Sequence, residues 1–290
     1  MKLILAILLV LSCKAFSCDY LVVGKNICVT KYDGQIRRYS VFVPSLTSFA
    51  EKTPLVLDIH GYSSTALQQE AMSGMKQMAK KENFVVVWPN GSFNQAGLRY
   101  HDADFCCNFT GIERDDIGFM RMIVERVSSI LTIDEKRIHA TGLSNGGAMT
   151  YHLYCNASDL FTAFAPIVFN LGERINCQPQ FKRPIYSFNS IQDSLIPHEG
   201  GVMIPQGEIL STDATLKRIA AINGCSDKFI VRELKGKSKC IEYLDCDEPV
   251  KHCTLDNPNQ PMGGHILYFN DDDLKLAPII WNFFKTTSSI

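Results

Sequence analysis

Short apolar runs alternate along this chain with longer segments in which apolar residues recur every three or four positions. The short runs predict strands at residues 36–43, 54–59, 84–88, 137–141, 164–169, 184–188 and 250–254. The periodic segments predict helices at residues 65–81, 115–131 and 274–285, and a further helix that starts near residue 148. Strands that alternate with helices form a mainly parallel sheet covered on both faces, so we expect an α/β fold in one domain over residues 18–290.

The most informative motif is Gly142-Leu143-Ser144-Asn145-Gly146, which lies between a predicted strand and a predicted helix. A Gly-x-Ser-x-Gly in that position is the nucleophile elbow of α/β-hydrolases. The serine occupies a sharp, strained turn, and the two glycines lack side chains so that strand and helix can pass closely. The motif therefore predicts the α/β-hydrolase fold, with Ser144 as the nucleophile.

A seryl hydroxyl needs a base to accept its proton and an acid to orient that base, and in this fold both follow the serine, acid first. Four of the seven histidines lie beyond Ser144. His152 would lie two turns into the following helix, and His252 lies inside a predicted strand, where we expect packing or a surface role. His265 follows a glycine-rich loop before the last helix. We assign His265 as the base, with His198 as the alternative.

The acid that fits this base is Asp193, in the loop after the strand at residues 184–188. The alternative interpretation is an aspartate that only caps a turn. The acidic run at residues 271–273 is read as a solvated helix start.

The charge that develops on the substrate oxygen needs two backbone N–H donors. We expect one from Asn145, directly after the nucleophile, and the other from Tyr62, in the loop that follows the early strand at residues 54–59. His60 and Gly61 lie in the same loop. His60 precedes Ser144 in the chain, so we expect a structural or substrate-adjacent role for it.

Charge and the N-terminal sequence indicate which partners to exclude and where the protein is located. The chain has 290 residues and a formal net charge of −1, without a basic run, so nucleic acid and anionic membranes are not expected as partners. Lys2, the apolar residues 3–11 and the small residues Ala15 and Ser17 predict a secretory signal peptide over residues 1–17, cleaved before Cys18. The apolar run is far shorter than the ~20 residues that span a membrane. We expect a secreted, extracellular monomer.

The cysteines agree with secretion. Removal of residues 1–17 takes away Cys13, one of 11 cysteines, and the even number that remains predicts up to five disulfides in an oxidising compartment. A zinc site at the late cysteines, Cys225 to Cys253, lacks a supporting Cys-x2-4-Cys spacing, and we expect neither a metal nor another cofactor. The pairs that we expect join Cys106 or Cys107 to Cys155, and Cys225, Cys240, Cys246 and Cys253 among themselves.

Three Asn-x-Ser/Thr sequons mark candidate glycosylation sites, at Asn90, Asn108 and Asn156. A secreted chain from a eukaryotic host would meet the glycosylation machinery at each of them.

Several motifs also follow one another in a fixed order. They are Cys106-Cys107, then Asp115-Asp116-Ile117-Gly118-Phe119, then Asp134-Glu135-Lys136-Arg137, and then Gly142 to Gly147. This set, together with Ile59-His60-Gly61 and Gly263-Gly264-His265, resembles the secreted feruloyl esterase and polyhydroxybutyrate depolymerase family of α/β-hydrolases. The resemblance covers the chain from Val41 to the last helix. It implies the triad Ser144, Asp193 and His265, in agreement with the placement above.

The spacing of Cys246 and Cys253 before Gly-Gly-His resembles the feruloyl esterase branch of that family. Two segments depart from the family pattern. The family often has Trp in the segment before the double cysteine, where this chain has Arg99-Tyr100-His101-Asp102. It often has Thr or Trp and then Pro after Gly-Gly-His, where Ile266-Leu267-Tyr268 stands. Both segments lie near the expected substrate cleft.

The resemblance implies a secreted serine esterase that releases a hydroxycinnamate such as ferulate from plant cell-wall xylan or pectin. Polyhydroxybutyrate depolymerase and acetyl (xylan) esterase are the alternatives within this class. A non-catalytic carbohydrate-binding or adhesion protein on the same fold is the alternative from a different class. Such proteins commonly lose the serine or the histidine, and this sequence retains both.

Overall fold

The computed structural model describes residues 18–104, 106–108, 111–203, 207–256, 259–270 and 274–287. The strands of its main sheet are β1 (Gly24–Tyr32), β2 (Gln35–Val43), β3 (Thr53–Ile59), β4 (Val85–Pro89), β7 (Ile133–Leu143), β8 (Ala163–Ile167), β9 (Ile185–Ser190), β12 (Phe229–Glu233), β13 (Lys239–Tyr243) and β14 (Val250–Leu255). Two small hairpins are formed by β5 (Ser92–Phe93) with β6 (Arg99–Tyr100), and by β10 (Gly201–Met203) with β11 (Gly207–Ile209). The α-helices are α1 (Ala66–Met72), α2 (Met75–Glu82), α3 (Asp116–Ser128), α4 (Asn145–Asn156), α5 (Thr212–Ile222) and α6 (Leu276–Thr287). Short 3-10 helices are η1 (Leu46–Phe49), η2 (Pro261–Gly264) and η3 (Leu267–Phe269).

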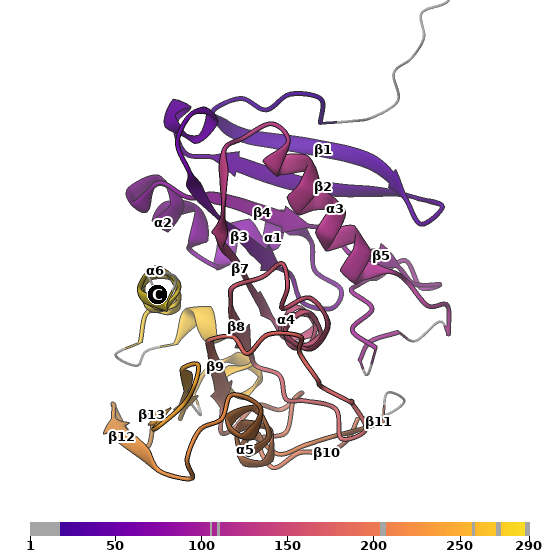
Figure 1. The fold of residues 1–290 in the computed structure, drawn as a ribbon. Coiled ribbons are helices and arrows are strands. Elements are labelled where there is room, and N and C mark those ends of the chain that lie inside the picture. The colour runs from indigo at the N-terminus through magenta and orange to yellow at the C-terminus, as the bar shows by residue number, and fades with distance from the viewer. Residues whose placement is uncertain are drawn as a thin grey trace, which may run out of the picture.

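The sheet has ten strands in the order β1-β2-β4-β3-β7-β8-β9-β14-β13-β12 (Figure 1). The six strands from β4 to β14 are parallel, and antiparallel strands extend the sheet at both edges. Every residue of β3, β4 and β8 is buried, as expected for parallel strands covered on both faces. The predicted fold class, an α/β-hydrolase sheet that is mainly parallel, is confirmed.

Helices cover both faces of this sheet. The helices α3, α4 and α5 pack on one face, in a core that includes Phe119, Tyr151 and Ile219. The helices α1, α2 and α6 pack on the other, around Trp88 and Phe284. Figure 1 shows α2 and α6 on the side of the sheet opposite to α3 and α5.

The predicted elements are present, with one correction. The helix predicted over residues 65–81 is two helices, α1 and α2, because Gly74 adopts a left-handed backbone (φ 76°) between them. Its missing side chain also leaves room for Ala277 of α6, since a Cβ at Gly74 would lie 3.2 Å from the Ala277 Cβ. The helix α5 and the strands β1, β12 and β13 were not predicted.

Five disulfides use all ten cysteines of residues 18–290. They are Cys18–Cys28, Cys106–Cys107, Cys155–Cys177, Cys225–Cys246 and Cys240–Cys253. The expectation that the last four cysteines pair among themselves is confirmed.

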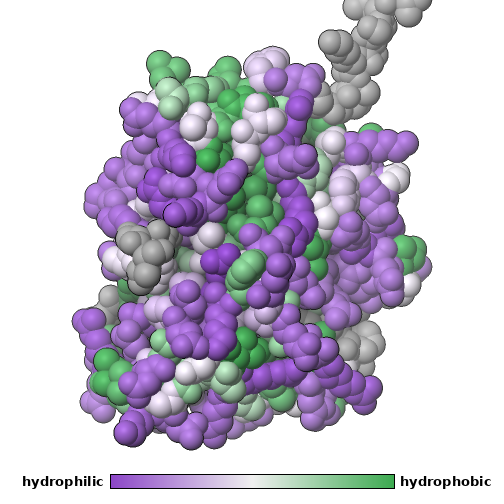
Figure 2. Space-filling view, in the orientation of Figure 1, coloured by the Kyte–Doolittle hydropathy of each residue, from purple (hydrophilic) through white to green (hydrophobic). Residues whose placement is uncertain are grey.

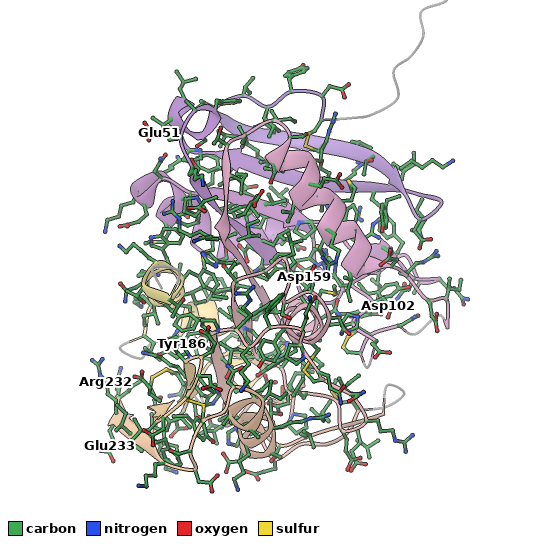
Figure 3. All side chains as sticks on the ribbon, viewed as in Figure 1. Glu51, Asp102, Asp159, Tyr186, Arg232 and Glu233 are labelled. Atoms are coloured by element: carbon green, nitrogen blue, oxygen red, sulfur yellow. A yellow bond between two sulfur atoms is a disulfide. The ribbon has the colours of Figure 1, made fainter. Side chains whose placement is uncertain are left out.

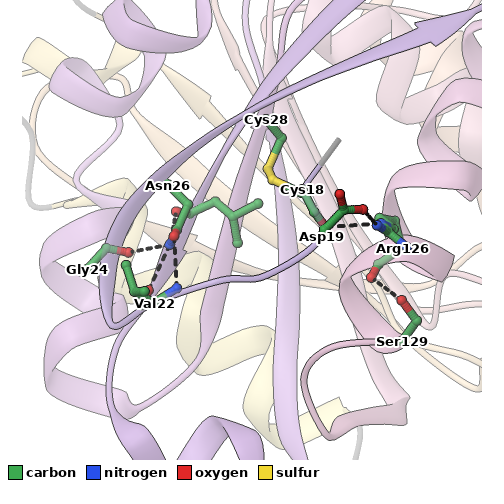
Figure 4. The surroundings of a disulfide bond; sticks show 9 residues. Cys18, Asp19, Val22, Gly24, Asn26, Cys28, Arg126 and Ser129 are labelled. Atoms are coloured by element: carbon green, nitrogen blue, oxygen red, sulfur yellow. Dashed lines mark hydrogen bonds and ion pairs between the residues drawn. A yellow bond between two sulfur atoms is a disulfide. The ribbon is translucent and has the colours of Figure 1, made fainter. Parts of the chain in front are cut away.

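The expected bond from Cys106 or Cys107 to Cys155 is wrong. The two neighbouring cysteines are bonded to each other, and Cys155, at the end of α4, lies beside Cys177, with a Cα–Cα distance of 4.8 Å. Cys18–Cys28 ties the start of the described chain to β1, and Asp19 forms an ion pair with Arg126 of α3 beside it (Figure 4).

The edge strand β12 differs from the rest of the sheet, because all five of its residues are exposed. Phe229, Ile230 and Val231 are each about half exposed, and Arg232 and Glu233 follow them. Figure 3 shows these two charged side chains at the outer edge of the molecule, and in Figure 2 hydrophobic residues are visible in the same region. Among the residues that the structure describes, β12 pairs only with β13, so its other backbone edge is unpaired.

The predicted signal peptide at residues 1–17 and the acidic run at residues 271–273 lie outside the described residues. Within the described ranges, none of the helices combines the length and the apolar character needed to cross a bilayer.

Candidate active site

Ser144 lies in a sharp turn between β7 and α4. Its backbone has φ 57° and ψ −118°, a strained conformation for a residue with a side chain. Its N–H donates to the Ile167 carbonyl of β8 at 2.9 Å, and its own carbonyl accepts from the Ala148 N–H at 2.9 Å. These bonds fix the turn from both sides, and the residue remains partly exposed.

The glycines around Ser144 allow three segments of backbone to meet. A Cβ on Gly142 would lie 2.8 Å from the Ile59 carbonyl oxygen, and a Cβ on Gly146 would overlap the same oxygen. A Cβ on Gly61 would lie 3.3 Å from the Ser144 Cβ and 3.9 Å from its Oγ. The loop after β3 therefore lies directly beside the Ser144 side chain.

His265 and Asp193 form a buried pair. The His265 Nδ1 and the Asp193 Oδ2 are 2.7 Å apart, and their side chains are 6% and 2% exposed. The other oxygen, Asp193 Oδ1, accepts from the N–H groups of Leu195 (2.8 Å) and Ile196 (2.9 Å). Asp193 thus caps a turn and contacts the histidine as well. A proton on Nδ1 toward the carboxylate leaves Nε2 as the ring's acceptor.

The loops that carry these two residues are bonded to each other. The Ser190 Oγ donates to the Gly263 carbonyl at 2.7 Å, and the Ser194 N–H donates to the Met262 carbonyl at 3.2 Å. Gly263 has φ 65°, and a Cβ on it would overlap the Gln192 carbonyl oxygen. The Gly-Gly-His sequence is thus packed closely against the loop that carries Asp193.

Ser144, Asp193 and His265 follow the carboxyl ends of β7, β9 and β14. These strands are parallel and lie within four neighbouring positions of the sheet. The carboxyl ends of parallel strands share one edge of a sheet, where α/β proteins place their ligands. The topology therefore brings all three predicted residues to the same edge.

The loop after β3 is fixed by His60, which is fully buried. The His60 Nε2 accepts from the Gly91 N–H at 3.0 Å, and its Nδ1 lies 2.7 Å from the Gly61 carbonyl. Burial, followed by the charge that His101 would carry, holds the pKa of His60 well below its usual range. The ring is therefore neutral and serves as a bridge between two loops.

The predicted oxyanion donors belong to the two segments next to Ser144, the start of α4 and the loop after β3. Asn145 is the first residue of α4, where N–H groups have no acceptor within the helix. Its side chain is occupied elsewhere, because its Oδ1 accepts from the His101 N–H (2.7 Å) and its Nδ2 donates to the His101 carbonyl (2.9 Å). Tyr62 follows Gly61, and its hydroxyl accepts from Asn94 at 2.7 Å.

The three other histidines beyond Ser144 have different partners. His252 is buried in β14 and bonds the hydroxyls of Ser187 (2.8 Å) and Thr254 (2.9 Å). The His152 ring lies 3.3 Å from the Asn156 amide within α4. The His198 carbonyl accepts from the Thr212 N–H. Of the four, His265 is the one that the structure places on Asp193.

Sequence reasoning missed a buried ion pair behind the site. Arg37 of β2 and Asp116, the second acid of the Asp-Asp-x-Gly-Phe motif, are 2.5 Å apart and almost fully buried. Asp116 also accepts from the Asp102 N–H at 2.7 Å, and Asp102 accepts from Asn108 at 2.7 Å. The motif thereby organises the loop that carries the double cysteine. The signal available in the sequence was Arg37 within a strand that continues as an apolar run.

The same loop reaches the elbow, because the Cys106 Sγ lies 3.8 Å from the Asn145 amide. Across the described part of the chain, no group of three or more His, Cys, Asp or Glu side chains is placed to bind a metal ion. Among the sequon asparagines, Asn156 is exposed, whereas Asn90 and Asn108 are partly buried. The Asn108 sequon extends outside the described residues.

Comparison with known proteins supports the sequence resemblance. Feruloyl esterase B of Piromyces equi is 28% identical over 262 residues, which are 87% of this chain and 45% of that protein. The bifunctional acetylxylan esterase/xylanase XynS20E of Neocallimastix patriciarum is 29% identical over 156 residues, 54% of this chain and 21% of that protein. The chain thus spans about half the length, or less, of these curated relatives.

Among solved structures, that of a thermostable esterase superposes with a TM-score of 0.60 over 90% of this chain and 62% of that chain, at 19% identity. A likeness at this identity supports the fold. No protein-family model matches the sequence. Fold, elbow and sequence similarity together identify the chain as an α/β-hydrolase similar to the feruloyl esterases.

Proposed function

We propose that this protein is a secreted serine carboxylic-ester hydrolase with the triad Ser144, His265 and Asp193. The observation that carries the proposal is the buried bond of 2.7 Å between His265 and Asp193, at the sheet edge where Ser144 occupies a nucleophile elbow. A histidine oriented by a carboxylate beside an elbow serine is the arrangement that activates a hydroxyl for acyl transfer.

In this mechanism the Ser144 Oγ attacks the ester carbonyl while the His265 Nε2 accepts its proton. Asp193 orients the imidazole and stabilises its charged form. The N–H groups of Asn145 and Tyr62 stabilise the oxyanion, and the N-terminus of α4 adds a favourable dipole. His265 then gives its proton to the leaving alcohol, and a water molecule, activated by the same ring, releases the acid from the acyl-enzyme.

The substrate that we propose is a hydroxycinnamate ester of plant cell-wall polysaccharide. The similarity to a feruloyl esterase over 87% of the chain supports this choice. Acetylated xylan is the second candidate, because a relative named an acetylxylan esterase/xylanase matches 54% of the chain.

Secretion is part of the proposal. The five disulfides fit an oxidising compartment, and the predicted signal peptide at residues 1–17 would deliver the chain there. Asn156 is the sequon asparagine most accessible to a glycan. We propose that the secreted enzyme acts as a monomer.

The test measures hydrolysis of methyl ferulate and of p-nitrophenyl acetate by the protein and by Ser144→Ala. We expect a loss of about 10³-fold or more in kcat for the variant. A matched control is Ser129→Ala, since the exposed Ser129 hydroxyl only caps the end of α3, and this variant should keep full activity. Equal rates for Ser144→Ala and the unchanged protein would overturn the mechanism.

The substrate pair also separates the candidate functions. Rapid cleavage of the nitrophenyl ester without cleavage of methyl ferulate would remove the feruloyl assignment and favour acetylated xylan. If neither ester is cleaved and xylan is bound, the chain would be a carbohydrate-binding protein on a hydrolase fold.

A further inference from the structure

A fully buried carboxylate lies in a parallel strand of the main sheet. Asp58 is the next-to-last residue of β3 and is 0% exposed. Its Oδ1 accepts from the Gln69 Nε2 at 2.6 Å, and its Oδ2 accepts from the Trp88 Nε1 at 2.7 Å. Within the described ranges, no basic side chain forms an ion pair with it. Burial raises the pKa of Asp58 to about 6, although bonds from Gln69, Ser73 and Trp88 oppose that rise.

The network continues from Asp58 to the loop of the proposed base. The Gln69 Nε2 also donates to the Tyr268 hydroxyl at 2.8 Å, and Gln69 is 0% exposed. Gln69 lies in α1, directly after the loop of His60, Gly61 and Tyr62, whereas Tyr268 lies in η3, three residues beyond His265. One buried carboxylate is therefore linked through Gln69 to the helix that follows the loop of His60, Gly61 and Tyr62 and to the loop of His265.

The loop of His265 needs such a connection, because irregular backbone surrounds it. Met262 and Gly263 have left-handed backbones, and only short 3-10 turns lie on either side of the histidine. Before His265, bonds from Ser190 and Ser194 attach the loop to that of the acid. After it, the Tyr268 hydroxyl attaches the loop to Gln69. His265 is thus anchored on both sides.

An apolar side chain at position 58 would be the simpler choice for a fully buried strand. Burying an ionised carboxylate without a cation is unfavourable, and an apolar core is often at least as stable. Position 58 nevertheless carries an acid. Its bonded neighbours are Gln69 of α1 and Trp88 of β4, and Gln69 extends the connection to Tyr268 in the loop of His265. Tyr268 is also one of the residues that depart from the family pattern after Gly-Gly-His.

We propose that Asp58, Gln69 and Tyr268 form a positioning unit that fixes the His265 imidazole relative to Ser144. The unit rests on the proposed function in one respect, since it matters for catalysis only if His265 is the base. None of its members contacts the substrate. Each acts through the loop that carries the ring.

The test compares Tyr268→Phe with Tyr154→Phe. The second variant removes another buried tyrosine hydroxyl bond, to Asn223 at 2.7 Å, at the far end of α4. We expect Tyr268→Phe to lower kcat for p-nitrophenyl acetate about tenfold with KM unchanged, because small misplacements of a catalytic group are costly. Tyr154→Phe should leave kcat unchanged. Equal kcat values for the two variants, or a loss confined to KM, would overturn the proposal.

Gln69→Met and the double variant Gln69→Met/Tyr268→Phe examine whether the residues act together. Because both remove the same connection, the double variant should lose no more kcat than the larger single loss. Losses that multiply would show independent effects and contradict a single unit. If Gln69→Met fails to fold, Asp58→Asn replaces it in the cycle.

An NMR measurement that does not depend on catalysis tests this proposal separately from the proposed function. The proton between His265 and Asp193 should give a low-field NMR signal, assigned by its loss in Asp193→Asn. Tyr268→Phe should shift that signal or speed its exchange with water, and Tyr154→Phe should not. An unchanged signal would overturn the positioning role, whereas an active Ser144→Ala would overturn only the esterase mechanism.

Discussion

Ser144 and His265 lie at the same edge of the sheet, but different interactions fix them. Around Ser144 the position of the side chain is fixed by the backbone. A strand, a helix and the loop after β3 meet at glycines, and main-chain hydrogen bonds close the turn. Around His265 the backbone is irregular, and side chains from distant parts of the chain fix the loop. After the proposed roles of the two residues, we call these the nucleophile side and the base side.

The difference indicates which kind of substitution should disrupt each side. Steric changes in the backbone should damage the nucleophile side, whereas loss of single hydrogen bonds should damage the base side. The predictions below test that division, beginning with the largest expected effect.

Asp193→Asn should break the base side most severely. An asparagine cannot stabilise the charged imidazole and favours the wrong ring tautomer, so we expect kcat to fall about 10⁴-fold. The unfolding midpoint in urea should change little by comparison. Asp213→Asn, at an exposed position in α5, is the control and should keep full activity. A loss below tenfold would mean that Asp193 only caps its turn.

Gly146→Ala should break the nucleophile side through the backbone. The new methyl group would overlap the Ile59 carbonyl oxygen, and strand and helix would have to separate. We expect the free energy of unfolding to fall by about 3 kcal/mol or more, measured by urea denaturation. Gly97→Ala serves as the comparison, since that glycine has a positive φ but open space around it, and should cost about 1–2 kcal/mol. Equal costs would contradict the steric argument.

Cys240→Ala/Cys253→Ala tests whether the base side depends on a distant cross-link. This disulfide joins β13 to β14, the strand that leads to His265, and closes a loop of 13 residues. Its loss should lower the free energy of unfolding by about 3 kcal/mol. We expect kcat to stay unchanged at a temperature where the variant is folded. A fall in kcat larger than that of Tyr268→Phe would extend the positioning unit into β14.

His101→Leu tests how the stability of the protein depends on pH near the nucleophile side, where the His101 backbone bonds the Asn145 side chain. Burial, with the charges of Arg37 and Arg99, lowers the pKa of His101 to about 3, so the ring protonates much more readily in the unfolded chain. Stability should therefore fall by about 1.4 kcal/mol for each pH unit from about 6.5 toward 3, and the leucine variant should lose this part of the slope. Neither ring nitrogen has a hydrogen-bond partner among the described residues, so the substitution removes no bond.

Asp58→Asn should change the slope in the opposite direction. The raised pKa of Asp58 makes the folded state hold its proton more tightly, which lowers stability as pH rises from about 3.8 to about 6. Without that carboxyl, stability should rise more steeply with pH over this range. The same change in urea midpoint between pH 4 and pH 6 for this variant and for the unchanged protein would contradict the assignment.

The nucleophile side was the easier one to predict from sequence, for a physical reason. Five consecutive residues between a strand and a helix define the elbow, so a local sequence motif is enough to recognise it. Asp193 could be placed because it follows the end of a predicted strand, which is β9 in the structure. The catalytic roles of these residues remain predictions until the variants are measured.

The base side and the cross-links were harder to predict, because they depend on distances between remote residues. Gln69 and Tyr268 are 199 positions apart, and no local pattern relates them. Cys155 pairs with Cys177 because the end of α4 reaches it, which spacing does not reveal. The break at Gly74 depends on the approach of α6 as well as on the glycine itself.

The exposed edge strand β12 has a consequence for handling the protein. An open row of backbone donors and acceptors next to Phe229, Ile230 and Val231 is a template on which another chain can add a strand. Arg232 and Glu233 bring opposite charges to the end of that row, and burying them in a new pair would be unfavourable. A preparation in which both are replaced by valine should therefore form aggregates on storage, long before its fold is lost.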